Sequence, residues 1–203
     1  MNRAFDVVLA GVGLVFASPV LAAAAVATKL EDGGPVFYWQ TRVGKDGIDF
    51  DLVKLRTMVV GAEHQGAGFA VNRGDSRITR PGRLLRRTSV DELPQLWNIL
   101  RGDMSAIGPR PTLRYQVEKY DERQRRRLYV KPGLTGWAQV NGRASLPWAD
   151  RIELDVWYVE NRNWKVDLEI LVRTPLALFS GTYKGATGGW TDPAPQPSEP
   201  GNK

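Results

Sequence analysis

Two adjacent acidic residues, Asp91 and Glu92, are the side chains of this sequence best suited to chemistry. Ser89, followed three residues later by Glu92, fits a capping box at a helix start, which is a structural role. Pro94 favours a second interpretation, in which the helix begins near Asp91, because proline is tolerated only in the first helical turn. In both interpretations the backbone N–H groups of a helix N-terminus favour anions. Two adjacent carboxylates can then serve as a nucleophile and as a ligand of a hard cation.

Arginines accompany this acidic pair. Arg86 and Arg87 lie just upstream, and Arg110 stands between two prolines. Guanidinium groups bind phosphate oxygens through paired hydrogen bonds. The chain has no cysteine and one histidine, His64, which excludes a thiol nucleophile and thiolate or multi-histidine metal sites. We assign His64 no role, and the remaining residue types predict metal-assisted phosphoryl chemistry.

The composition is that of a basic folded domain. The 203 residues include 28 Lys and Arg against 22 Asp and Glu, a net charge of +6, with a pI near 9.7 and a mean hydropathy of −0.32. These values exclude a polytopic membrane protein, a disordered chain and a collagen-like repeat. The length suits one domain with an appendage. The basic excess predicts an anionic partner, either nucleic acid, acidic lipid or a phosphorylated substrate.

The N-terminal residues 7–27 carry no charge, and as one helix they would be roughly 30 Å long, enough to cross a bilayer. They fit a cleaved signal peptide, a transmembrane anchor, or a helix that breaks midway and returns to the same face. Ser18-Pro19 favours the third interpretation, because proline removes a helical hydrogen bond and serine can satisfy the freed carbonyl. Each limb is then about 12 residues long, too short to span. Positive residues at both ends, Arg3 and Lys29, give no bias for crossing.

The remaining pattern predicts a mostly helical α+β fold. Residues 44–47 predict a turn between strands over 36–43 and 48–58, a small β-hairpin. Helices are expected over 90–100, 113–129, 147–160 and 167–179, some of them amphipathic and interfacial, and arginines 123 and 125–127 are interpreted as a solvated or lipid-facing surface. Residues 1–32 then form a membrane helix that breaks and returns, 33–181 a folded domain beside it, and the Gly/Pro-rich 182–203 a disordered tail.

A series of specific sequence motifs extends over nearly the whole chain, from Arg3 to about Gly181. In order they are Arg3-Ala4-Phe5-Asp6, Ser18-Pro19, Gly34-Pro35-Val36-Phe37, Gln40-Thr41-Arg42-Val43-Gly44, Lys54-Leu55-Arg56-Thr57-Met58, Asp75-Ser76-Arg77-Ile78-Thr79, Asp91-Glu92, Gly102-Asp103-Met104-Ser105, Gly108-Pro109-Arg110-Pro111 and Pro132-Gly133-Leu134-Thr135-Gly136-Trp137-Ala138-Gln139-Val140-Asn141-Gly142-Arg143. With these blocks the chain resembles the small monotopic phosphoglycosyl transferases of the bacterial sugar transferase family.

The resemblance implies a specific reaction. Such enzymes transfer a phosphosugar from a UDP-sugar to undecaprenyl or another polyprenyl phosphate, release UMP, and initiate glycoconjugate or exopolysaccharide synthesis. Asp91 matches the family's nucleophile, which forms a covalent phosphosugar-aspartyl intermediate in a ping-pong reaction. Glu92 matches the residue that holds Mg²⁺, and we take Asp91 as a second metal ligand. Arg86 and Arg110 match phosphate-binding arginines.

The resemblance also adds candidate substrate-binding residues. Arg143 lies in the block associated with uridine nucleotide binding, and Gln139 lies in the same block. Lys54 is either a neighbour of the phosphates or a solvated residue. Asp155 and Asp167 are interpreted as structural contacts or as site residues.

Ser18-Pro19 matches the break in the family's re-entrant helix, which implies a monotopic protein on the cytoplasmic face of the bacterial inner membrane. The resemblance makes residues 1–32 the re-entrant membrane helix and 33–181 a cytosolic catalytic domain at the membrane surface. The implied partners are a UDP-sugar, undecaprenyl phosphate and membrane lipid, with Mg²⁺ as cofactor. A homodimer is reasonable for a membrane-surface enzyme, and no nucleic acid is expected. The alternative is a membrane-anchored, basic nucleic-acid-binding protein, supported by the charge and the arginines of 123–127, but it leaves Asp91-Glu92 unexplained.

Overall fold

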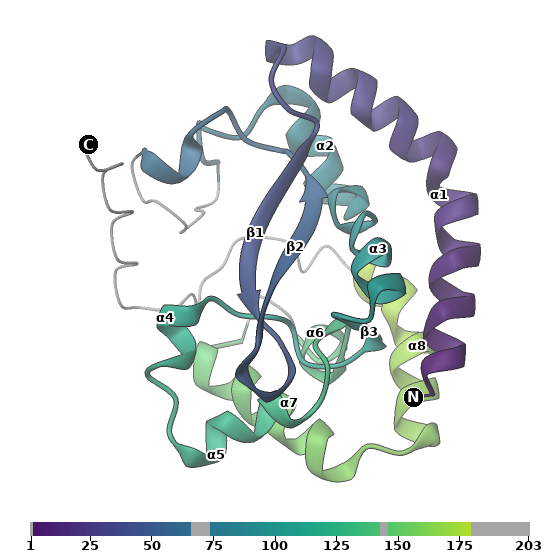
Figure 1. Cartoon of the computed structure of the whole chain (residues 1–203), viewed down its shortest axis with the longest axis vertical. Helices are drawn as coiled ribbons and strands as arrows, with labels where there is room; N and C mark the ends of the chain where they lie inside the picture. The colour runs from purple at the N-terminus through teal and green to yellow at the C-terminus, as the bar shows by residue number, and fades with distance from the viewer. Residues whose placement is uncertain (1, 66–73, 143–145, 180–203) are drawn as a thin grey trace.

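The computed structural model describes residues 2–65, 74–142 and 146–179. Within these ranges the chain is mostly helical with two small sheets, as the sequence predicts. One long N-terminal helix runs along the side of a globular part that contains the β-hairpin and the shorter helices (Figure 1). The predicted tail 182–203 and the candidate Arg143 lie outside the described residues.

The helices and strands alternate irregularly along the chain, as expected of an α+β fold. The sheets are an antiparallel hairpin, β1 with β2, and a short parallel pair, β3 with β4. In chain order the elements are α1 (Arg3–Asp32), β1 (Phe37–Val43), β2 (Asp49–Leu55), α2 (Arg80–Thr88), α3 (Gln95–Arg101), β3 (Ser105–Ile107), α4 (Arg114–Val117), α5 (Glu122–Arg125), β4 (Gly133–Thr135), α6 (Trp137–Val140), α7 (Trp148–Asn161) and α8 (Trp164–Phe179).

Helix α1 passes through Ser18-Pro19 without interruption. Pro19 has no N–H to offer the carbonyl of Val15, and the Ser18 hydroxyl donates to this carbonyl at 2.8 Å instead. This confirms the expected role of the serine, and it explains why the helix continues. Figure 1 shows α1 bending along its length, so the predicted break is not seen, and re-entry into the membrane stays a prediction.

Both ends of α1 are attached to the globular part. Arg3 donates to two carbonyls near the C-terminal end of α3, at 2.5 and 2.6 Å. Asp6 is buried and accepts hydrogen bonds of 2.9 Å from a hydroxyl and a backbone N–H of β3. At the other end, Asp32 pairs with the buried guanidinium of Arg56 through two contacts of 2.6 Å. The cleaved signal peptide does not account for these contacts.

The surface of α1 is nevertheless apolar. It is the one helix of the described residues that is long and apolar enough to cross a membrane, and only 11% of its most apolar stretch is buried. A core helix of a soluble protein would be mostly buried, so the exposure distinguishes α1 from such a helix. Its exposed apolar side chains include Val8, Val12, Val15, Phe16 and Leu30.

The hairpin forms where the sequence predicts it. Tyr38 of β1 lies opposite Lys54 of β2, and Arg42 lies opposite Phe50. The turn contains two residues with positive φ, Asp46 and Gly47, a conformation that glycine and aspartate adopt more readily than most residues. Because side chains alternate across a strand, Tyr38, Arg42 and Lys54 share one face of the hairpin.

Two helix predictions need correction. Residues 113–129 form α4, α5 and a 3₁₀ turn, Arg126–Tyr129, and not one helix. The side chain of Asp121 accepts from the N–H of Gln124 at 2.8 Å and starts α5 anew, which is the usual competition of aspartate with a continuous helix. Residues 90–100 form a 3₁₀ turn followed by α3.

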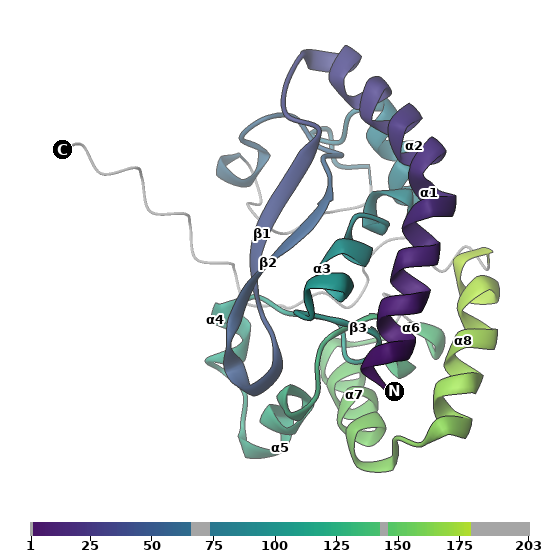
Figure 2. The ribbon, with the colours of Figure 1, turned by 45° about the vertical axis from the view of Figure 1, so that its right-hand side comes forward.

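The main hydrophobic core connects α1 to the globular part, and α8 lies beside the N-terminal half of α1 in both views (Figure 1, Figure 2). The parallel pair β3–β4 passes close to the core, where a Cβ on Gly133 would lie 2.0 Å from the backbone nitrogen of Gly108, so only glycine fits there. The buried core residues are Ala10, Leu52, Leu96, Ile99, Met104, Ala106, Ile107, Tyr158 and Ile170.

Candidate active site

Asp91 and Glu92 lie in a 3₁₀ turn, Val90–Glu92, between α2 and α3. Ser89 ends α2 with a left-handed conformation, φ 58°, and its side chain makes no capping bond. Both sequence interpretations of this segment are therefore wrong in detail. There is no capping box, and α3 begins only after Pro94, where proline needs no N–H partner. A three-residue turn between two helices holds the carboxylates.

The Asp91 carboxyl is almost fully buried, with 7% of the residue exposed. Its Oδ1 has no hydrogen-bond partner among the described residues. Burial and the neighbouring charge of Glu92 together raise the pKa of Asp91 to about 7, against the opposing effect of Lys54, Arg86 and Arg110. A buried carboxyl with an unsatisfied oxygen and a pKa near neutrality is typical of a functional group.

Glu92 is engaged by Arg110. One guanidinium nitrogen of Arg110 lies 3.2 Å from Oε2 of Glu92, and the other contacts Oε1 more closely. This two-point contact is the geometry in which arginine binds carboxylates and phosphates. The predicted acidic pair and the predicted phosphate-binding arginine thus meet across 18 residues of sequence.

Arg110 is held in place by a buried network. Its carbonyl accepts from Nη2 of Arg127 at 2.8 Å. Arg127 in turn lies 2.5 Å from Asp155 and donates to the hydroxyl of Tyr120 at 2.6 Å. The interpretation of Arg127 as part of a solvated surface is wrong, because only 4% of its side chain is exposed.

Asp155 and Asp167, which the sequence leaves as structural contacts or as site residues, both have structural partners. Asp155 belongs to the network of Arg127, and burial raises its pKa although Arg127 opposes the shift. Asp167 accepts from the hydroxyl of Tyr158 at 2.7 Å. His64 is exposed and lies 3.7 Å from its neighbour Glu63, at the edge of the described residues.

The hairpin supplies further positive charge. Burial and the charge of Arg42 together lower the pKa of Lys54 to about 8, against the opposing effect of Asp91 and Glu92. Lys54 is half-buried, and its charge interacts with both carboxylates of the acidic pair. Arg42 was missed as a candidate by the sequence reasoning, although its alternation with Tyr38 and Gln40 along β1 places these three on one face.

The other candidates are less closely associated with the acidic pair. Nη1 of Arg86 lies 3.4 Å from the hydroxyl of Thr57, and its charge acts on Asp91. Gln139 is buried in α6, and neither atom of its amide has a partner among the described residues. No hydrogen bond in the described parts of the chain joins Gln139 to Asp91 or Glu92.

The acidic pair fits Mg²⁺ in one specific way. No group of three or more acidic or histidine side chains that could hold a metal ion gathers in the described parts of the chain, so these residues alone build no complete metal site. Mg²⁺ is commonly held by one or two carboxylates, with substrate phosphates and water completing its shell. Asp91, with its unsatisfied Oδ1, and Glu92 fit such a site.

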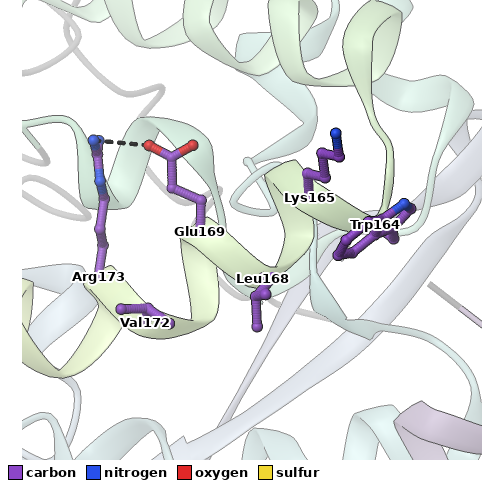
Figure 3. Close-up of a pocket in the computed structure, with 6 residues that line it drawn as sticks. All are labelled: Trp164, Lys165, Leu168, Glu169, Val172 and Arg173. Atoms are coloured by element: carbon purple, nitrogen blue, oxygen red, sulfur yellow. Dashed lines mark ion pairs between the residues drawn. The ribbon is translucent and has the colours of Figure 1, made fainter.

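A surface pocket on α8 contains none of the predicted site residues. Figure 3 shows Leu168 and Val172 projecting from one side of this helix, whereas Lys165, Glu169 and Arg173 project from the other. Together with Trp164 and Leu176, the two aliphatic residues form an exposed apolar stripe at four-residue spacing. The spacing marks one face of an amphipathic helix, as the sequence predicts for an interfacial helix.

Comparisons with known proteins identify the family of the chain. A sequence model of the family described as bacterial sugar transferase matches residues 1–181. The chain is 44% identical to the "Uncharacterized sugar transferase EpsL" of Bacillus subtilis (strain 168), over 86% of this chain and 85% of that protein.

Two relatives have more specific names. A "UDP-glucose:undecaprenyl-phosphate glucose-1-phosphate transferase" of Caulobacter vibrioides is 42% identical over 88% of this chain and 70% of its own length. A "UDP-N-acetylgalactosamine-undecaprenyl-phosphate N-acetylgalactosaminephosphotransferase" of Aeromonas hydrophila is 40% identical over 89% of this chain, which spans only 44% of that protein. The protein therefore belongs to the bacterial sugar transferase family.

Proposed function

We propose that this protein transfers a phosphosugar from a UDP-sugar to undecaprenyl phosphate, releases UMP, and so initiates the synthesis of an exopolysaccharide or another glycoconjugate. The observation that carries the proposal is the buried Asp91, which has an unsatisfied oxygen beside the Glu92–Arg110 pair and the charge of Lys54. The names of the two relatives given above, both undecaprenyl-phosphate phosphotransferases, support the same reaction.

In the proposed first step, an oxygen of the Asp91 carboxylate attacks the β-phosphorus of the UDP-sugar. The bond from this phosphorus to the bridging oxygen breaks, and UMP leaves with the electron pair. In the second step a phosphate oxygen of undecaprenyl phosphate attacks the same phosphorus, forms the diphosphate linkage and restores the Asp91 carboxylate. A covalent intermediate allows one pocket to accept two bulky substrates in turn.

The surrounding cations reduce charge repulsion in this reaction. Two unit charges 4 Å apart repel by about 4 kcal/mol at an effective dielectric constant near 20, which corresponds to nearly three decades in rate at about 1.4 kcal/mol per decade. Arg110, Arg86 and Lys54 lie where they can offset the repulsion between an approaching carboxylate and a diphosphate. Asp91 and Glu92 would hold Mg²⁺, which supplies charge neutralisation when bound.

We further propose that the chain is monotopic, on the cytoplasmic face of the inner membrane. Arg3 and Asp32, at opposite ends of α1, both contact the same globular part, which supports a helix that enters and leaves the membrane on one side. The apolar surfaces of α1 and α8 would face lipid. An active site at the headgroup level need not extract the acceptor, which would cost about 0.8 kcal/mol per exposed CH₂.

A UMP-release assay tests the proposed reaction. The full chain is incubated with undecaprenyl phosphate, Mg²⁺ and, in turn, UDP-glucose, UDP-galactose and N-acetylated UDP-sugars. We expect acceptor-dependent UMP release with at least one donor, and its loss in Asp91→Asn but not in Asp150→Asn, a matched change at an exposed aspartate of α7. UMP release by Asp91→Asn at the wild-type rate would overturn the assignment of the nucleophile.

Cysteine labelling tests the topology without background, because the chain has no cysteine. Asn2→Cys and Leu30→Cys mark the two ends of α1, both exposed. We expect a membrane-impermeant maleimide to label both positions from the cytoplasmic side only. When Ser18 and Pro19 are both changed to alanine, we expect the helix to straighten and the two labels to report opposite faces. Opposite faces in the wild type would contradict the monotopic proposal.

A further inference from the structure

The guanidinium of Arg42 lies on the face of β1 that also carries Tyr38 and Gln40, and two contacts hold it in place. Nη2 donates to the side-chain oxygen of Gln40 at 2.6 Å, and Nη1 points to the carbonyl of Pro111 at 3.4 Å. The second contact places the guanidinium next to the turn that carries Arg110. The Nε of Arg42 is buried and has no hydrogen-bond partner in the parts of the chain that the structure describes.

Arg42 as a whole is half-buried, and the three fully buried arginines of the described residues have different partners. Arg56 pairs with Asp32, Arg77 with Asp75 and Arg127 with Asp155, each at 2.5–2.7 Å. These pairs follow the rule that a charge removed from water is compensated by an opposite charge. Within residues 2–65, 74–142 and 146–179, Arg42 has an amide and a carbonyl as partners but no carboxylate. The neutral partners orient the guanidinium but do not neutralise it.

The nearest charges increase the imbalance at Arg42. Burial and the positive charge of Arg110 together lower the pKa of Arg42 to about 10, whereas Glu92 has only a small opposing effect. Lys54 lies on the same face of the hairpin and is also affected by the charge of Arg42. Three cations therefore converge, and Glu92 is already engaged by Arg110. A preorganised cluster of this kind is suited to an anion from outside the protein.

We propose that Arg42 is a further substrate-binding residue, whose guanidinium binds a phosphate group beside Asp91 and Glu92. This inference rests on the proposed function and adds a ligand to that site. Gln40 is the positioning residue, because its amide oxygen fixes the guanidinium while leaving Nε for the ligand. The phosphate belongs either to the diphosphate of the donor or to the phosphate of the lipid acceptor, which share the same chemistry.

The first arm of the test measures binding without turnover. Inorganic pyrophosphate is titrated calorimetrically into the full chain in detergent micelles, with metal removed by EDTA, for the wild type, Arg42→Met and Arg114→Met. Arg114 is a matched control, because it is an exposed arginine near the hairpin turn with its own carboxylate, Asp49. Both variants lower the net charge equally. We expect Arg42→Met to weaken pyrophosphate binding about tenfold or more, as for the loss of a hydrogen-bonded charge, and Arg114→Met to have little effect.

The second arm identifies the source of the phosphate. The KM for the UDP-sugar and the KM for undecaprenyl phosphate are measured separately in Arg42→Met. A tenfold rise in the KM for undecaprenyl phosphate alone assigns Arg42 to the lipid phosphate. A rise in the KM for the UDP-sugar together with weaker pyrophosphate binding assigns Arg42 to the diphosphate. The inference is overturned if pyrophosphate binding and both KM values are unchanged.

Two controls separate this inference from other failures. If no UDP-sugar is turned over by the wild type, the proposed function fails, and pyrophosphate binding alone decides the role of Arg42. If Arg42→Met alters the circular dichroism spectrum, Arg42→Lys replaces it, since lysine keeps the charge but cannot present the planar fork of donors. Arg42→Lys should then melt like the wild type and bind pyrophosphate several-fold more weakly. Unchanged binding by Arg42→Lys would refute the specific role of the guanidinium.

Discussion

Replacing Asp91 with asparagine should stabilise the protein while abolishing its activity, and the stabilisation should depend on pH. The wild-type carboxyl must lose its proton inside the fold, where burial and Glu92 raise its pKa from 3.8 to about 7. Asparagine has nearly the same shape and no charge to desolvate. The conflict between stability and chemistry is expected of an active-site residue.

The sign and the size of this stabilisation follow from the linkage between proton binding and folding. A carboxyl with a folded pKa above its unfolded value costs the folded state no stability below about pH 4. The cost grows by about 1.4 kcal/mol per pH unit between the two pKa values and is constant above about pH 7. It therefore amounts to roughly 1.5 kcal/mol at pH 5 and about 4 kcal/mol at pH 8. The advantage of Asp91→Asn over the wild type should increase by about 2 to 3 kcal/mol between these pH values.

Urea denaturation of both proteins in detergent micelles at pH 5 and pH 8 measures how the difference in their free energies of unfolding changes with pH. Groups that do not interact with Asp91 titrate alike in the two proteins, so their contributions cancel. Asp150→Asn, at an exposed position, should show no such pH dependence. An advantage of Asp91→Asn that stays constant or shrinks from pH 5 to pH 8 would refute the reasoning, because Asp91 would then ionise in the folded protein as easily as in the unfolded chain.

Three further predictions concern the surroundings of the site. Arg56→Met should lower the free energy of unfolding by about 2 kcal/mol, because it removes the hydrogen bonds of a buried guanidinium to Asp32 and to two backbone carbonyls, whereas Arg114→Met, in an exposed pair, should cost less than about 1 kcal/mol in the same denaturation experiment. The kcat/KM for the donor should rise with pH until about pH 7, as Asp91 ionises, and fall above about pH 8, as Lys54 loses its charge; a flat profile from pH 6 to pH 9 would contradict both assignments. Leu168→Asp should reduce co-sedimentation with anionic liposomes, because it places a charge on the apolar stripe of α8, and an unchanged bound fraction would show that this stripe does not contact lipid.

Much of the fold could be predicted because local signals determine it. The glycines around residues 44–47 predict the hairpin turn, and the structure forms it there. The serine before Pro19 predicts its own hydrogen bond to the freed carbonyl. The spacing of apolar residues predicts α7 and α8, although α8 begins three residues earlier, at Trp164, since Asn163 accepts from the N–H of Lys165.

The sequence predictions are wrong where two local rules compete or where residues distant in sequence meet. Asp121 can continue a helix or cap a new one, and in the structure it caps α5. Ser89 can cap a helix or adopt a left-handed conformation that ends one, and it does the second. Arg127 stands in a basic run that predicts a surface position, because the neighbouring sequence does not indicate its partner Asp155, 28 residues away.

The same limit applies to the site. Asp91, Glu92 and Arg110 could be selected by residue type, and the structure joins them. Arg42 lies near Arg110 because β1 pairs with β2 and because its guanidinium contacts the turn at Pro111. Such convergence of separate segments is tertiary information, which residue spacing alone does not contain.

The central claim is that Asp91 forms a covalent bond to the phosphosugar, and intact-protein mass spectrometry tests it most directly. The full chain is mixed with Mg²⁺ and a UDP-sugar that it turns over, without acceptor, and quenched rapidly in acid. We predict a mass increase equal to one phosphosugar, located on the peptide that contains Asp91, which disappears when undecaprenyl phosphate is added before the quench and never forms in Asp91→Asn. An adduct on another residue, or wild-type turnover with no adduct at any time, would contradict the account.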